Sequence, residues 1–279
     1  MTPAERALTR AAFAAAPISL AELQERAELL ARFDRSYFVP AAVFDDFAAR
    51  LREAYGFRAL AIHGRRVFAY HSVYFDTAGL RSYHDHRQGR RRRFKIRERL
   101  YEDTGERQFE IKLKGARGET VKRRRPLEAA EAELGPGARG FLAEVLWAEY
   151  GLAAPGGLAR SLVTDYVRST FVADGQRITC DAGLACAEAG AGARVGVEAG
   201  AAGAAVRADP GLVLVEVKST GHLTAADRLL HRYGLRAAEF TKYCGAMAAM
   251  RPELPRNRWG RAVRVAFASG EGEGDQHRR

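Results

Sequence analysis

Basic and apolar residues alternate along three consecutive segments near the middle of the chain, and this alternation limits the possible folds more than any other sequence feature. In RRRRFKIRERLY, residues 90–101, positions 93, 95, 97, 99 and 101 are Arg, Lys, Arg, Arg and Tyr, whereas 94, 96, 98 and 100 are Phe, Ile, Glu and Leu. Segments 108–115 and 119–127 repeat the pattern after two turns. Because successive strand side chains point to opposite faces, the segments predict an antiparallel meander with one basic and one apolar face.

The remaining elements are predicted from hydrophobic periodicity and turn residues. Strands are expected at 32–40, 67–76, 161–172, 176–181 and 211–220, and helices at 19–31, 41–54, 127–134, 138–150, 223–233 and 240–250. Segment 187–210 is almost all Ala and Gly and is expected to be a flexible loop, since Gly at this density weakens helix and strand alike. The tail after Pro255 is expected to be disordered.

The charge balance favours an anionic partner. Lys and Arg number 45 against 34 Asp and Glu, a formal net charge of +11 with an isoelectric point near 9.9. Nucleic acid, an acidic membrane face and a phosphorylated small molecule all fit such an excess, and a basic surface kept for solubility is the alternative. Three unclustered cysteines predict neither disulfides nor zinc. With no signal-peptide core and no apolar run of about 18 residues, we expect a cytoplasmic protein.

The basic strands offer a two-dimensional grid for phosphate groups. Strands lie about 4.8 Å apart, and Arg and Lys contribute bidentate and point-charge contacts respectively. The basic parity recurs at Arg168, Arg177 and Lys218. A merely solvated sheet face is the competing interpretation. Two carboxylates on the same lines, Glu110 and Glu216, are either ion-pair partners or ligands of a divalent metal, and the pattern leaves both open.

Known catalytic motifs do not account for the chain. It has no P-loop, no GxGxxG after a strand, no HExxH and no nucleophile elbow. Aromatic residues on the basic face are sparse, Tyr101 being the clearest, so a platform for single-stranded nucleic acid is not expected.

Eight short motifs in a fixed order resemble one family, the polyphosphate polymerase (VTC) domain of the triphosphate tunnel metalloenzymes. They are SVYFDT at 72–77, RERLY at 97–101, EIKLK at 110–114, VKRR at 121–124, YVRSTF at 166–171, RITCD at 177–181, VEVK at 215–218 and FTKY at 240–243. The resemblance covers roughly residues 32–250. It divides the chain into an N-terminal helical extension (1–31), a tunnel domain (32–250, with loop 187–210) and a tail (251–279).

The resemblance implies an α+β fold, a closed antiparallel β-tunnel of about eight strands with flanking helices and the basic face inside. It implies an enzyme that transfers the terminal phosphate of ATP to inorganic polyphosphate with a divalent ion, Mn²⁺ or Mg²⁺. Two alternatives stay open: a hydrolase of triphosphate or polyphosphate with the same fold, and a non-catalytic binder of polyphosphate or nucleic acid. ATP and polyphosphate are the implied partners; whether a membrane partner receives the polymer stays open.

The matched motifs also imply roles for individual residues. The implied catalytic residues are Arg97, Arg99, Lys112 and Lys242; the implied phosphate ligands are Lys114, Lys122, Arg124, Arg168, Arg177, Lys218 and Thr241; the implied metal ligand is Glu216. Thr241 stands where the family more often has Ser. We expect tunnel arginines such as Arg97 to be unpaired and to add little to stability.

One position departs from the family pattern. The opening strand usually reads acid-x-Lys, with the Lys entering the tunnel, whereas here it reads Asp34-Arg35-Ser36. Arg35 has the opposite parity and cannot simply replace that Lys. A binder or a slow enzyme therefore gains weight as an alternative.

Overall fold

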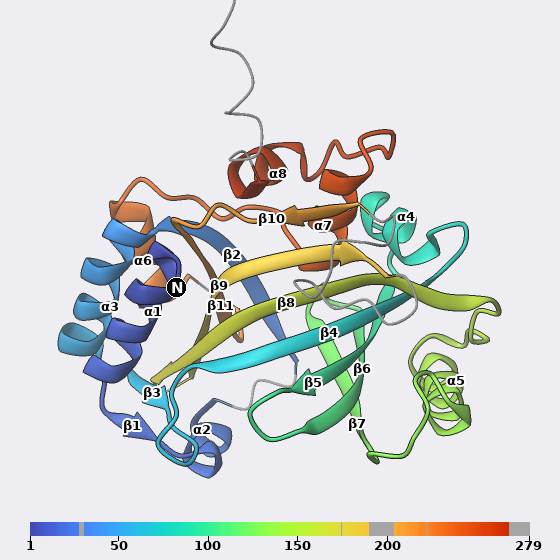
Figure 1. The fold of residues 1–279 in the computed structure, drawn as a ribbon, viewed down its shortest axis with the longest axis horizontal. Helices are drawn as coiled ribbons and strands as arrows, with labels where there is room; N and C mark the ends of the chain where they lie inside the picture. The colour runs from blue at the N-terminus through green and yellow to red at the C-terminus, as the bar shows by residue number, and fades with distance from the viewer. Residues whose placement is uncertain (28–30, 174, 190–203, 222, 268–279) are drawn as a thin grey trace, which may run out of the picture.

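Eight antiparallel strands close into a ring in the computed structural model of the chain, which describes residues 1–27, 31–173, 175–189, 204–221 and 223–267 (Figure 1). The ring order is β8-β4-β5-β6-β7-β2-β11-β9, and β9 pairs back onto β8. The ring strands are β2 (Ala31–Pro40), β4 (Phe68–Thr77), β5 (Phe94–Tyr101), β6 (Glu106–Lys114), β7 (Thr120–Leu127), β8 (Leu158–Ala173), β9 (Gln176–Glu188) and β11 (Leu212–Ser219). The predicted closed antiparallel tunnel is therefore confirmed.

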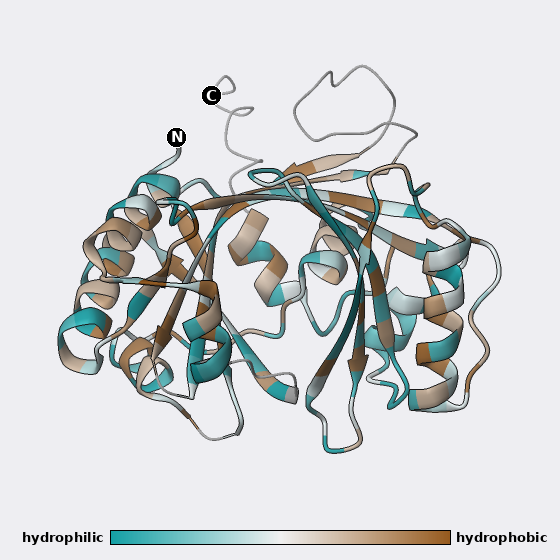
Figure 2. Cartoon of the chain, turned by 90° about the horizontal axis from the view of Figure 1, so that it is seen from below, coloured by the Kyte–Doolittle hydropathy of each residue, from teal (hydrophilic) through white to brown (hydrophobic). Residues whose placement is uncertain are grey.

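Three short strands attach to this ring. Strand β3 (Arg58–Leu60) pairs with β8, β1 (Pro17–Ile18) runs parallel to β3, and β10 (Ala205–Arg207) pairs with β9. The narrowest join within the ring lies between β7 and β2, where the described residues form two pairs, Ala31 with Val121 and Arg32 with Thr120. The strands arch over the interior (Figure 2).

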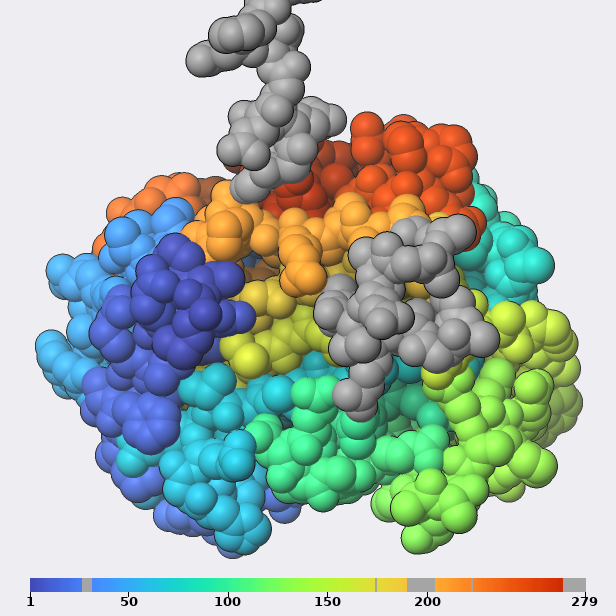
Figure 3. Space-filling view, viewed as in Figure 1, coloured from blue at the N-terminus to red at the C-terminus, as the bar shows by residue number. Residues whose placement is uncertain are grey.

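The helices around the ring are α1 (Pro3–Ala14), α2 (Leu20–Ala27), α3 (Ala41–Tyr55), α4 (Arg81–Arg87), α5 (Pro136–Tyr150), α6 (Ala225–Arg232), α7 (Lys242–Met250) and α8 (Gly260–Phe267). Helices α1, α3, α5 and α6 cover its outer, apolar face, whereas α7 packs against the inner-face side chains of Tyr74 and Tyr166. Residues of α1, α3 and α6 share a core with β2, β9 and β11, and α5 packs on β5 and β6. Figure 3 shows the N-terminal helices in blue at one end and the C-terminal helices in red along one side. The basic face is thereby turned inward.

Four local predictions differ from the structure. The helix predicted at 127–134 does not form: Leu127 ends β7, and residues 128–135 are turns in which Glu131 and Glu133 pair with Arg125 and Arg160. Leu134 is buried with a φ of 48°, which interrupts any helix before α5.

The Ala- and Gly-rich loop is shorter than predicted, and the tail is partly ordered. Residues 187–188 belong to β9 and 205–207 to β10, because neighbouring strands supply the hydrogen bonds; 190–203 lie outside the described residues. Helix α8 forms where a disordered tail was expected. Trp259, Ala262, Val263 and Ala266 are buried at helical spacing, a signal that the sequence already carried. Residues 268–279 of the predicted tail lie outside the described residues.

The predicted helix 19–31 ends earlier, since α2 stops at Ala27 and Ala31 already belongs to β2. The three cysteines are free and buried, as expected from their spacing. Within the described parts of the chain, no helix has the length and apolar character needed to cross a membrane.

A buried carboxylate fixes α6 against the outside of β2. Asp227 is fully buried and accepts hydrogen bonds from Arg35 Nε at 2.9 Å, from Arg35 Nη2 at 2.8 Å and from the Tyr37 hydroxyl at 2.8 Å. It also accepts from the backbone N–H of Thr224, the N-cap of α6. Arg35 thus points out of the tunnel, as its parity predicts.

We predict that Asp227→Ala lowers the free energy of unfolding by about 3 kcal/mol, because the substitution removes the buried carboxylate that the Arg35 guanidinium and the Tyr37 hydroxyl share. Urea denaturation followed by circular dichroism measures this change. Asp45→Ala, which breaks an exposed pair with Arg10, is the matched control and should change the midpoint little. Equal midpoints for the two variants would contradict the structural role of Asp227.

Candidate functional site

The ring encloses one large cavity, of about 950 Å³. All twelve site residues suggested by the sequence line it: Arg97, Arg99, Lys112, Lys114, Lys122, Arg124, Arg168, Arg177, Glu216, Lys218, Thr241 and Lys242. They come from seven elements, β5, β6, β7, β8, β9, β11 and α7, together with the N-cap of α7. Alternation along each strand turns the side chains inward, and closure of the ring brings them together.

The buried carboxylate of Glu110 neutralises part of the positive charge that lines the cavity. Its side chain is fully buried; Arg97 Nε donates to Oε2 at 2.7 Å, Lys122 Nζ contacts Oε1, and Arg99 Nη1 lies 3.8 Å from Oε2. Burial alone favours the neutral acid. The charges of Arg97, Lys122 and Arg99 outweigh it and hold the pKa of Glu110 well below its ordinary value. Of the two interpretations left open by the sequence, ion pairing is therefore the one that Glu110 fits.

Asp181 plays the same part on the opposite wall. It is fully buried, accepts from Arg168 Nε at 2.5 Å and Nη2 at 2.7 Å, and lies 2.5 Å from Lys242 Nζ. Asp181 was not among the residues predicted from sequence, although it shares the inward parity of Arg177. With Asp181 beneath them, Arg168 and Lys242 are held with their charges compensated.

Glu216 differs from these two carboxylates because it faces the cavity. Its side chain is 18% exposed, and Oε2 lies 3.0 Å from Lys218 Nζ and 3.5 Å from Arg168 Nη2. Lys242 Nζ lies 4.0 Å from Oε1. Although burial raises it, the pKa of Glu216 is held well below its ordinary value by Lys218, Lys242 and Arg168. The carboxylate is therefore ionised and reachable at neutral pH.

Tyrosine rings contact several of the cavity cations. The prediction from sequence that aromatic residues are sparse on this face did not include them. Tyr70 and Tyr166 stack with their rings 5.4 Å apart and 5° from parallel. Arg99 lies 4.8 Å above Tyr70 and donates to the Tyr166 hydroxyl at 2.8 Å, while Lys242 Nζ lies 4.7 Å from the Tyr166 ring. Both tyrosines share the inward parity of Arg168, so alternation could have found them. Such contacts orient the cations without neutralising them.

Some of the other cavity cations have no carboxylate within ion-pair distance among the described residues. Lys112, Arg124 and Arg177 form no ion pair there. Burial, reinforced by Arg97, lowers the pKa of Lys112 well below its ordinary value. Burial also lowers the pKa of Arg177 to about 10, with Arg32 as the next cause. Desolvated cations without nearby partners are costly to the fold and available to an anion.

Strand β2 carries Ser36 at the position where the family pattern has a lysine, and two charged residues lie on the same face. Ser36 is paired with Glu216 in the register of β2 and β11, and Arg32 and Asp34 share its inward parity. Arg32 Nε donates to Asp34 Oδ1 at 2.9 Å, and Arg32 is 5% exposed. The sequence analysis did not select this pair. An arginine four residues before Ser36 therefore adds a cation to the same wall.

Thr241 holds the start of α7. Its hydroxyl oxygen accepts from the backbone N–H of Cys244 at 3.2 Å, as an N-cap does. The hydroxyl hydrogen remains available to donate toward the cavity that Thr241 lines.

The cavity fits a divalent ion that is shared with a ligand. Glu216 and Asp34 both line it. Burial raises the pKa of Asp34, but Arg32, Lys218 and Lys112 lower it by more. Among the described residues, no three metal-ligating side chains cluster inside the tunnel. Mg²⁺ and similar hard cations are commonly held by one or two carboxylates together with substrate phosphates. The residues suit such a bridging ion rather than an all-protein cage.

Comparison with protein-family models places the chain in one family. A family model described as the VTC domain matches residues 29–140 and 153–251. No curated protein matches the chain significantly.

Solved structures give more distant similarities. A candidate adenylate cyclase from Bacillus halodurans is 14% identical, with a TM-score of 0.46 over 75% of this chain and 93% of that one. A candidate adenylate cyclase from Vibrio parahaemolyticus is 13% identical, with a TM-score of 0.40 over 76% and 94%. A candidate adenylyl cyclase from Hippeastrum, described as having a dominant triphosphatase activity, is 15% identical, with a TM-score of 0.38 over 80% and 98%.

Replacing a cavity cation that has no ion pair should weaken ligand binding without lowering stability, whereas replacing an ion-paired cation should lower stability. We predict that Lys112→Met weakens polyphosphate binding by about 1–3 kcal/mol while leaving the melting temperature unchanged or higher, because a desolvated charge is removed. Arg97→Met should lower the free energy of unfolding by about 2 kcal/mol, because buried Glu110 loses one of its three cations.

This second expectation corrects the one drawn from sequence, in which Arg97 was unpaired. Thermal melts and calorimetric titration with polyphosphate measure both quantities. A Lys112→Met protein that melts far below wild type, or an Arg97→Met protein that melts with it, would contradict the distinction.

Binding should also depend on pH in a definite direction. Burial lowers the pKa of Lys122 and of Lys218 to about 8, against the opposing pull of Glu110 and Glu216 respectively. Each ammonium is thus present below that pH and lost above it. We predict that polyphosphate affinity falls between about pH 7.5 and about 9.5, by up to tenfold per unit for each titrating lysine.

The variant Lys122→Arg keeps its charge throughout this range, so its affinity should fall less steeply with pH. Titrations at constant ionic strength measure the slope. Identical slopes for the two proteins would show that Lys122 does not titrate on binding.

Proposed function

Because the chain belongs to the VTC domain family, we propose that it is a metal-dependent polyphosphate polymerase that moves the terminal phosphate of ATP onto an inorganic polyphosphate chain. The observation that carries the proposal is the cavity itself, a closed ring of strands whose inner face combines many cations with the cavity-facing carboxylate of Glu216. A chain of phosphates needs several positive groups at fixed spacing, which neighbouring strands supply.

In this proposal one set of cations contacts the phosphoryl group that is transferred, and a second set binds the other phosphates. Arg97, Arg99, Lys112 and Lys242 surround the transferring phosphoryl group. Lys114, Lys122, Arg124, Arg168, Arg177, Lys218 and the Thr241 hydroxyl hold the remaining phosphates. The Glu110 and Asp181 carboxylates keep Arg97, Arg168 and Lys242 oriented before a ligand arrives. Such preorganisation is the main source of catalysis when charge is redistributed in a transition state.

The reaction needs little proton transfer. An oxygen of the terminal polyphosphate group, already ionised at neutral pH, attacks the γ-phosphorus of ATP, the bond from that phosphorus to the β–γ bridging oxygen breaks, and ADP leaves. No strong general base is therefore required, and positioning with charge neutralisation dominates. A divalent ion held by Glu216, with Asp34 beside it, would supply additional neutralisation at the phosphate oxygens.

Product analysis tests the proposal. The protein is incubated with ATP and Mn²⁺, and the expected products are acid-stable polymer and ADP. Orthophosphate without polymer would support the hydrolase of the same fold instead, and binding without turnover would support a polyphosphate binder. Either of these outcomes would overturn the polymerase proposal.

Glu216→Gln separates the metal role from the ion-pair role, since it keeps the shape and removes the charge. We predict that turnover collapses and that extra Mn²⁺ restores it only partly, because a neutral amide is a poor ligand for a hard cation. Metal-free polyphosphate binding should persist or tighten, since a negative charge leaves a basic cavity.

The measurements are the rate against Mn²⁺ concentration and the affinity without metal, on the same protein. Glu53→Gln, at an exposed carboxylate paired with Arg52 outside the cavity, is the matched control and should behave as wild type. Near-normal turnover of Glu216→Gln at limiting Mn²⁺ would exclude Glu216 as the metal ligand.

A further inference from the structure

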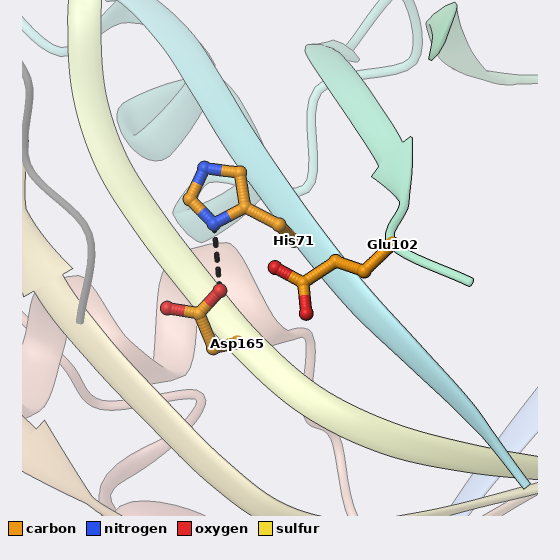
Figure 4. Close-up of side chains that lie close together, drawn as sticks. All are labelled: His71, Glu102 and Asp165. Atoms are coloured by element: carbon orange, nitrogen blue, oxygen red, sulfur yellow. Dashed lines mark hydrogen bonds and ion pairs between the residues drawn. The ribbon is translucent and has the colours of Figure 1, made fainter. Parts of the chain in front are cut away.

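A second group of ionisable side chains lies on the outer face of the tunnel wall. His71, Glu102 and Asp165 each offer one ligand atom, and these three atoms lie within 4.8 Å of one another. Figure 4 shows the imidazole and the two carboxylates turned toward a common point, with Glu102 just beyond the end of β5. None of the three lines the cavity.

The strand register explains why these residues meet. His71 on β4 is paired with Asp165 on β8, and its Nδ1 lies 2.6 Å from Asp165 Oδ1. Glu102 continues β5 on the other side of β4, and its backbone N–H donates to Ala69 O at 3.2 Å. The site is thus built from three adjacent strands rather than from a loop.

The neighbouring backbone is held in place on both sides of Glu102. Before it, Tyr101 is paired with Tyr70; after it, Asp103 Oδ2 accepts from the backbone N–H of Ala69 at 2.8 Å. Beside Asp165 the β9 partner is Ala185, whose side chain is small. A side-chain group set on rigid strands with small neighbours is positioned before any ligand arrives.

The alternation of side chains along the strands places this outer group directly behind residues of the tunnel's inner face. Each of its residues is next in the chain to a tyrosine of the inner face: His71 follows Tyr70, Glu102 follows Tyr101, and Asp165 precedes Tyr166. Tyr70 stacks on Tyr166 and meets Tyr101 edge-on at 5.1 Å. The outer group therefore lies behind the tyrosines that support Arg99.

We propose that His71, Glu102 and Asp165 form a binding site for a divalent first-row transition-metal ion, separate from the tunnel. One imidazole nitrogen with two carboxylate oxygens is a ligand set that suits Zn²⁺ and its neighbours better than Mg²⁺ or Ca²⁺, which favour oxygen alone. The ion takes the place of the hydrogen between Nδ1 and Oδ1, and the imidazole proton then resides on Nε2. The bound ion links β8, β4 and β5.

The side chains are accessible enough to be loaded and to be changed. His71 is 12% exposed and Asp165 27%, and Glu102 is exposed. Substitutions here leave the cavity lining and the three hydrophobic core clusters intact. Failure or success of the polymerase proposal does not bear on this site, because no phosphate takes part in it.

The test is a titration of the full metal-free chain with Zn²⁺ against a chromophoric chelator, without nucleotide or polyphosphate. Wild type should bind one equivalent at this site, and Glu216→Gln should retain it, since the tunnel carboxylate is not involved. His71→Ala should bind that equivalent at least about tenfold more weakly, as expected when a direct ligand is lost. His63→Ala, at an exposed histidine elsewhere, is the matched control.

Thermal melts provide a second readout, because an ion that binds only the folded chain raises its melting temperature. Zn²⁺ should raise the melting temperature of wild type and of His63→Ala, and leave that of His71→Ala nearly unchanged. Should His71→Ala fold poorly, Glu102→Gln changes one exposed side chain and should also weaken binding. Zn²⁺ affinity and thermal shift equal to wild type in either folded variant, or no bound equivalent in wild type at micromolar Zn²⁺, would overturn the proposal.

Discussion

Repulsion among cations confined inside a closed ring of strands is the constraint on which the rest of this structure depends. Two unit charges 6 Å apart repel by about 3 kcal/mol at an effective dielectric constant of about 20. The fold answers by placing fully buried carboxylates directly against the cations. In the β5–β6 register Glu110 is opposite Arg97, and in the β8–β9 register Asp181 is opposite Arg168. Each carboxylate holds its partners by charge and by hydrogen bonds together.

The buried carboxylates compensate only part of the positive charge that lines the cavity. Lys112 and Arg177 are partly buried in the wall without an ion pair among the described residues, and desolvation lowers the pKa of both. The interior therefore keeps an excess of positive charge. A polyanion would relieve this excess, so the same groups that cost stability without a ligand are the ones that favour binding. The inward-facing cations therefore lower the stability of the ligand-free protein and raise its affinity for an anion.

Much of the site followed from alternation along the strands, and what alternation missed has a physical reason. It selected Arg97, Arg99 and Lys112 because they stand in dense basic runs. Tyr70 and Asp181 have the same inward parity but occur in strands where most inward residues are uncharged, so no local pattern marks them. The segment 128–135 shows the opposite failure, since good helix-forming residues are drawn into turns by ion pairs to Arg125 and Arg160. Tertiary contacts there outweigh local propensity.

By itself, the sequence determined which side chains share a strand face, because that depends only on the two-residue period of an extended backbone. It also determined the net charge of +11, which favours an anionic partner. Only the tertiary structure decided which face became the interior and which cation met which carboxylate. Asp181 and Lys242 come from different elements, and so do His71 and Asp165. Such pairs depend on how β8 and β9 close the ring and on where α7 begins, and long-range register of this kind is set by the packing of the whole molecule rather than by any local run of residues.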